Sequence, residues 1–122
     1  MTTGFIIFAH GSRIESANEA VRAVARQFAS AGSYPYVEAA FLELGQPDLA
    51  GAVQALAALN IQRIVVIPYF LTLGLHLERD LPHLLSDISH RFNNLEIIST
   101  PPLDGHPSLI EVLLDRARRA IP

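Results

Sequence analysis

Residues 4–13 read GFIIFAHGSR, and this stretch decides the fold class. Residues 4–9 are continuously apolar and rich in β-forming side chains, which is typical of a strand covered on both faces. Strands of this kind belong to parallel sheets flanked by helices. The apolar run stops at His10, Gly11 and Ser12, which bring an imidazole, a flexible backbone and a hydroxyl. The stretch therefore predicts a buried strand that presents polar groups at its carboxyl end.

Outward from this stretch, the chain alternates between strand-like and helix-like apolar spacing. Strands are predicted at 4–9, 36–42, 62–70 and 95–99, and helices at 15–31, 49–59, 80–92 and 107–120. We expect Asp48 and Asp80 to cap their helices, since Asp80 places Pro82 in the first turn, where proline is tolerated. Residues 71–79 are too irregular to assign. The order βαβαβαβα predicts an α/β fold with three layers: a small four-stranded parallel sheet with helices on both faces, in one domain spanning 1–122.

Composition excludes several classes of protein. The chain has 122 residues, half of them apolar, and a formal net charge of −3 with no basic surplus for nucleic acid. It has no cysteine, which removes disulfides, thiolate metal sites and cysteine nucleophiles. No apolar run is long enough to span a bilayer, and none has the features of a secretory signal. We therefore expect a cytoplasmic protein with no membrane or nucleic-acid partner.

Candidate functional residues follow the predicted strands, because ligands of open α/β sheets bind at the carboxyl ends of the strands. These residues are His10, Gly11, Ser12 and Arg13 after the first strand, Glu43 after the second, and His76 and Arg79 after the third. Imidazole and carboxylate together suit a divalent transition metal or acid–base chemistry. Each also has an ordinary interpretation: a histidine satisfied by backbone hydrogen bonds, a turn and helix cap, or a solvated surface charge.

Phosphate chemistry is the main alternative from the residues alone. A glycine between a strand and a helix is weakly consistent with anion binding at the helix N-terminus. However, neither G-x-G-x-x-G nor G-x-x-x-x-G-K-[ST] occurs. Histidine phosphatases carry an arginine directly before the catalytic histidine, and this chain has Ala9 at that position. Phosphoryl transfer through His10 is therefore disfavoured.

Four segments carry a resemblance to a known family. They are AHGSR (9–13), FLELGQPDL (41–49), VIPYFLTLGLHLERDLP (66–82) and PPLDGHPSL (101–109). In this order they closely resemble the sirohydrochlorin chelatases of cobalamin and siroheme biosynthesis. The length resembles the short, single-domain form of that family, whereas longer relatives carry two such domains.

The resemblance implies a chelatase-like domain that inserts a divalent metal, cobalt or iron, into sirohydrochlorin, with no organic cofactor. It implies that His10 and His76 are the catalytic, metal-binding histidines and that Glu43 accompanies them. It also implies a homodimer. Gly11, Ser12, Arg13 and Arg79 could then receive carboxylates of the ring. A nickel chelatase acting on a related tetrapyrrole, or a non-catalytic carrier of tetrapyrrole or metal on the same scaffold, remains an alternative.

Overall fold

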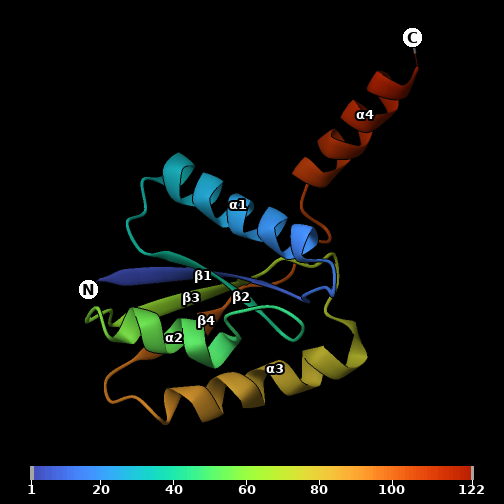
Figure 1. Cartoon of the computed structure of the whole chain (residues 1–122). Helices are drawn as coiled ribbons and strands as arrows, with labels where there is room; N and C mark the ends of the chain where they lie inside the picture. The colour runs from blue at the N-terminus through green and yellow to red at the C-terminus, as the bar shows by residue number, and fades with distance from the viewer. Residues whose placement is uncertain (1, 122) are drawn as a thin grey trace.

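A computed structural model describes residues 2–121, so Met1 and Pro122, the ends of the predicted domain, lie outside the described residues. The chain forms a four-stranded parallel sheet with strand order β2-β1-β3-β4 (Figure 1). The elements are β1 (Thr3–Ala9), α1 (Glu15–Gly32), β2 (Val37–Phe41), α2 (Leu49–Ala57), β3 (Arg63–Pro68), α3 (Gly74–Ser89), β4 (Glu96–Ser99) and α4 (Ser108–Ala120). The predicted α/β class, element order and parallel sheet are confirmed.

Helices cover the sheet on both faces and make the three layers (Figure 1). On the face of α2 and α3, Ile6 and Phe8 of β1 pack with Ile64 and Val66 of β3, and all four side chains are fully buried. On the opposite face, a smaller cluster centred on Ile7 packs against α1. β1 is thus apolar on both faces, which accounts for the unbroken apolar run that identified it.

The predicted cap of α2 is confirmed. Asp48 has an extended backbone, and its Oδ1 accepts a hydrogen bond of 2.8 Å from the amide of Gly51. This bond satisfies one of the amides that a helix leaves without an internal partner in its first turn. The Asp48 cap therefore fixes where α2 begins after β2.

The predicted start of α3 is wrong. The helix begins at Gly74, Leu73 occupies the N-cap position without a side-chain cap, and Pro82 lies inside the helix. The spacing of Leu73, Leu77 and Leu81 continues the apolar stripe of the helix upstream of Asp80, and all three pack against the core. Burial of this stripe outweighs the single backbone hydrogen bond that the exposed Pro82 removes. The segment left unassigned in the sequence therefore supplies the first turns of a helix.

α4 differs from the other helices because it projects away from the sheet (Figure 1). No residue of α4 is buried, although its apolar side chains recur at helical spacing. Four of them are exposed: Ile110, Leu113, Leu114 and, beside this stripe, Val112. The sequence predicted the helix, but α4 covers neither face of its own sheet. None of the helices in residues 2–121 is long and apolar enough to cross a membrane.

Candidate functional site

A cavity of about 560 Å³ opens at the carboxyl end of the sheet. It is lined by His10, Leu42, Leu73, Gly74, Leu75, His76, Leu77, Asp80 and Leu84. His10 directly follows β1, Leu42 directly follows β2, and the rest belong to α3 or to the residue before it. The two histidines that lie far apart in the sequence therefore share one cavity, whose lining is otherwise mainly apolar.

The imidazole of His10 is held by an aromatic neighbour. Its ring stands nearly perpendicular to that of Phe70, at 87° with 5.3 Å between ring centroids. Phe70 in turn meets the fully buried Phe8 edge-on, at 5.8 Å. These edge-to-face contacts restrict the orientation of the His10 ring while leaving the residue exposed at the cavity.

The segments after β1 and β2 lie in direct contact. The amide of Glu43 donates to the carbonyl of His10 at 3.1 Å. Gly11 has a φ of +93°, and a Cβ at this position would lie 1.6 Å from the carbonyl oxygen of Glu43. Only glycine permits both this backbone conformation and this close approach. We call residues 10–12 and 43–44 together the β1–β2 corner.

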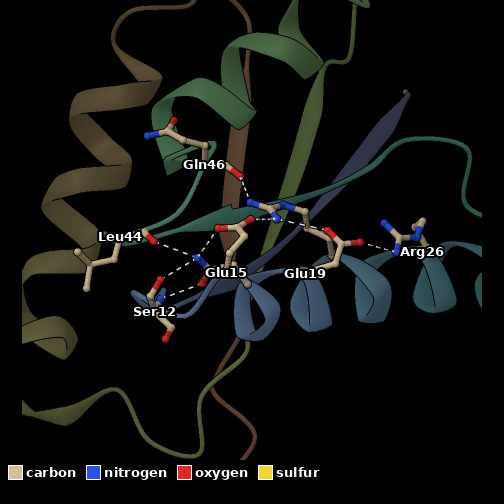
Figure 2. A network of polar contacts seen from close by, with 8 residues as sticks. Ser12, Glu15, Glu19, Arg26, Leu44 and Gln46 are labelled. Carbon is tan, nitrogen blue, oxygen red and sulfur yellow. Dashed lines mark hydrogen bonds and ion pairs between the residues drawn. The ribbon is translucent and has the colours of Figure 1, made fainter.

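The side chain of Asn18, on α1, lies inside this corner and is 1% exposed. Its Oδ1 accepts from the amide of Ser12 at 2.8 Å, and its Nδ2 donates to the carbonyls of Ser12 at 2.8 Å and Leu44 at 2.9 Å. Nδ2 also lies 3.3 Å from Oε2 of Glu15 (Figure 2). The Ser12 amide, predicted to be open to a ring carboxylate, is therefore already engaged. The hydroxyl of Ser12 accepts from the amide of Ile14 at 3.0 Å, but Ile14 is itself the N-cap residue of α1 and the helix has no side-chain cap, so the helix-capping interpretation of Ser12 is wrong.

The sequence interpretation did not single out Asn18. A signal was present, because Asn18 stands on the inward side of α1 at helical spacing from Val21, Ala25 and Phe28, which pack towards the sheet. A polar residue on an apolar stripe is a candidate for a buried hydrogen-bonding role. Its partners lie in loops distant in sequence, so the role itself could not be read from the spacing.

Beyond the corner, a charged network on the surface of α1 extends the polar contacts (Figure 2). Arg22 pairs with Glu15 and Glu19, and it donates to the carbonyl of Gln46 at 2.8 Å. The hydrogen bond from Arg22 is the main cause that lowers the pKa of Glu15 below its ordinary value. The pKa of Glu19 is lowered chiefly by the hydrogen bond from Arg26. The ion pairs lie within α1, and the hydrogen bond from Arg22 to Gln46 connects this helix to the segment between β2 and α2.

His76 lies in the exposed first turn of α3. Nη2 of Arg79 is 3.3 Å from Nδ1 of His76, and Nε of Arg79 is 3.6 Å from the carboxylate of Asp80. Because arginine can only donate, this contact makes Nδ1 the acceptor and leaves the proton of the neutral imidazole on Nε2. A metal ion at Nδ1 would take the position of the Arg79 contact. A metal ion at Nε2 would place the imidazole proton on Nδ1, which could then no longer accept from Arg79. In either case Arg79 has to move away.

The remaining predicted residues stand apart from the cavity lining. Glu43 is exposed, and it joins the site through its backbone. Arg13 is exposed beyond Ser12. Within residues 2–121, no group of three histidine, aspartate or glutamate side chains is close enough to hold a metal ion. The structure thus brings His10 and His76 to one cavity, and a metal site shared with Glu43 stays a prediction.

Comparison with known proteins gives a consistent result. The model of the CbiX family matches residues 4–120. The chain is 33% identical over 118 residues to a chloroplastic sirohydrochlorin ferrochelatase of Arabidopsis thaliana, covering 97% of this chain and 52% of that protein. It is 29% identical to a sirohydrochlorin cobaltochelatase of Methanothermobacter thermautotrophicus, covering 97% and 92% of the two chains. The resemblance noted in the sequence is confirmed.

Solved structures show the same fold. A CbiX protein from Marinobacter aquaeolei, described as putative in cobalamin biosynthesis, matches with a TM-score of 0.85 and 24% identity over 98% of this chain and 97% of that one. SirB from Bacillus subtilis with Fe³⁺ matches with a TM-score of 0.90 and 22% identity. That match covers 100% of this chain and 48% of SirB. The chain thus spans about half of SirB and of the plant relative, and nearly all of the archaeal relative.

Proposed function

Because the chain belongs to the CbiX family, we propose that it is a chelatase that inserts cobalt(II) or iron(II) into sirohydrochlorin. The observation that carries the proposal is the shared cavity, which receives His10 from the end of β1 and His76 from the start of α3. Relatives named as cobaltochelatase and as ferrochelatase support both the reaction and the choice of metals. The metal is a substrate, which the site has to receive and release.

The chemistry asks for groups that bind a cation loosely and accept protons. Metal insertion removes two protons from ring nitrogens and brings a partly dehydrated cation to the ring. A histidine can do either task, depending on its protonation. We assign these tasks to His10 and His76, with the Glu43 carboxylate favouring the cation nearby. A protein site with few ligands suits this reaction, because a complete ligand set would retain the metal.

The anionic ring needs complementary groups around the cavity. We propose that the guanidinium groups of Arg13 and Arg79 and the backbone of Gly11 receive ring carboxylates. The first turn of α3, which lines the cavity, adds the positive end of a helix dipole. The mainly apolar lining offers a surface for the face of a flat macrocycle.

The direct experiment follows the absorbance of sirohydrochlorin with cobalt(II) or iron(II) in the presence of the protein. We expect the wild type to accelerate insertion, and His10→Ala and His76→Ala each to remove most of the acceleration, by about a hundredfold or more, which is the range of a lost acid–base group. His83→Ala is the matched control, because His83 is exposed on α3 outside the cavity lining. Stoichiometric binding without acceleration would favour a carrier, and acceleration only with nickel and a related tetrapyrrole would favour the nickel alternative.

We also propose that residues 1–122 act as one domain in a homodimer, as the sequence resemblance implies. Two open apolar surfaces support this proposal. The stripe on α4 has no cover, and β4 leaves Ile98 41% exposed beside Val65 on the face of α1. The match to SirB takes in the whole of this chain, α4 included, in a protein about twice as long. A second copy would supply the missing half.

Sedimentation analysis tests the dimer. Leu113→Asp places a charge on the α4 stripe, so we expect it to shift the protein towards monomer. Glu111→Gln, an exposed change on the same helix, serves as control and keeps the dimer. A wild-type protein that stays monomeric at micromolar concentration would contradict the proposal. The cytoplasmic location expected from the sequence stays a prediction.

A further inference from the structure

We propose that Asn18 is a positioning residue of the site, which sets the placement of His10 relative to the segment after β2. The observation behind this proposal is the set of hydrogen bonds that its carboxamide makes inside the β1–β2 corner. One side chain from α1 bonds both the amide and the carbonyl of Ser12 and also the carbonyl of Leu44. The inference rests on the proposed chelatase reaction, because the role assigned to Asn18 is to support it.

The chemistry of the site explains why an asparagine suits this position. Two carbonyls and one amide converge on the corner, so the central group has to donate twice and accept once. A carboxamide does this with its NH₂ group and its oxygen, whereas a carboxylate could only accept and an apolar side chain could do neither. Within the part of the chain that the structure describes, Asn18 is the only polar residue classed as buried. Burial makes its bonds strong and costly to lose.

Leu44 adds a second indication that the corner is held in place. Its φ is +58°, a conformation that leucine adopts at an energetic cost, and its side chain is 52% exposed. In this conformation the carbonyl of Leu44 accepts a hydrogen bond of 2.9 Å from Nδ2 of Asn18, and this bond offsets the cost. Strained backbone of this kind persists where surrounding contacts hold it.

The effect on the site passes through the backbone. Ser12, bound twice by Asn18, follows His10 by two residues, and the carbonyl of His10 is bound by the amide of Glu43. Loss of Asn18 would free both strand ends to move relative to each other, and the His10 imidazole would move with them. Asn18 is not among the residues lining the cavity, so it acts on the reaction through His10 and does not touch the substrate.

The test compares two variants with a control on the same helix. Asn18→Ala removes the carboxamide, and Asn18→Leu keeps a similar branched shape without the hydrogen bonds, so the second variant retains packing if the first does not fold. Val21→Ala is the control. Val21 lies on the sheet-facing side of α1 and packs against the cluster around Ile7, so its truncation should lower stability without removing a hydrogen bond of the corner. All proteins are assayed well below their unfolding temperatures.

For both Asn18 variants we expect kcat to fall by at least about tenfold, the scale for losing a group that orients a ligand, with a smaller change in the KM for sirohydrochlorin. The ¹⁵N signals of the His10 imidazole should shift, while those of His76 stay unchanged; the two are assigned from His10→Ala and His76→Ala. Val21→Ala should lower the unfolding temperature and leave kcat and both histidine signals as in the wild type.

Two results separate this inference from the proposed function. If the wild type shows no chelatase activity but the His10 signals still shift in the Asn18 variants, the chelatase proposal fails and the positioning of His10 stands. If folded Asn18→Leu keeps the wild-type kcat and His10 signals, Asn18 is only a structural residue and the inference is overturned, whatever the activity of the wild type.

Discussion

The two histidines of the cavity are held in contrasting ways. His10 belongs to the β1–β2 corner, where its ring packs against Phe70 and its backbone neighbours are held by a crowded Gly11 and by the buried Asn18. His76 stands on an exposed helical turn, where the long, exposed side chain of Arg79 contacts its ring. The contrast teaches that one histidine is oriented by the fold itself, whereas the other is held only by a surface contact. Changes at the corner should therefore alter stability and activity together, and changes to the side chains around His76 should alter activity with little effect on stability.

The largest expected effect comes from Gly11→Ala. The new Cβ would meet the carbonyl oxygen of Glu43 at 1.6 Å, so the corner has to open, and the φ of +93° adds strain. We expect a loss of about 3 kcal/mol or more in the free energy of unfolding, together with loss of chelation. Denaturant unfolding and the chelation assay measure the two effects.

Gly74→Ala is the matched variant on the other side of the site. Its φ is +74°, but nothing lies within 4 Å of the added Cβ. Only the backbone strain remains, which costs about 1 kcal/mol. Equal losses of stability in the two glycine variants would show that the contact with the Glu43 carbonyl adds nothing to the backbone strain at Gly11.

Arg79→Ala tests the surface contact at His76. Arg79 contacts Nδ1 of His76, and metal binding to this imidazole requires that contact to break. We therefore expect the variant to bind cobalt(II) more tightly, by roughly fivefold, which corresponds to the ~1 kcal/mol of an exposed charged contact. Stability should hardly change. Calorimetric titration with cobalt(II) measures the affinity, and Arg91→Ala, an exposed arginine after α3, is the control. Unchanged affinity would mean that Arg79 does not compete with the metal.

The smallest effect concerns pH and the ion pairs next to the corner. The pKa values of Glu15 and Glu19 lie below their ordinary value of 4.5, so their contribution to stability is fully present above that pH. It is lost as the pH falls through the lowered pKa values, because protonation removes the pairing with arginine. Arg22→Gln should therefore be slightly less stable than the wild type at pH 7, and the difference should narrow as the pH falls through the lowered pKa values, leaving the part due to the hydrogen bond from Arg22 to the carbonyl of Gln46. A difference in urea midpoint that stays constant as the carboxylates are protonated would contradict this.

Local pattern was enough for most of the fold. Apolar runs placed the four strands, and helical spacing with an aspartate cap placed α2, because these signals depend on neighbours within a few residues. The start of α3 was mispredicted because Pro82 is a local signal, whereas the burial of Leu77 is a tertiary one, and the tertiary term was larger. The projection of α4 could not be foreseen either, since an amphipathic helix predicts a partner without saying which one.

For the site, the sequence by itself determined which residues stand at the carboxyl ends of the strands, since a parallel sheet collects those ends on one edge. It thereby placed His10 and His76 at the same rim, and the cavity bears this out. Only the tertiary structure decided that Glu43 meets His10 through its backbone and that Asn18 ties the corner from another element. The physical reason is that hydrogen bonds and close contacts between segments depend on ångström-scale distances, and spacing along the chain does not carry those distances.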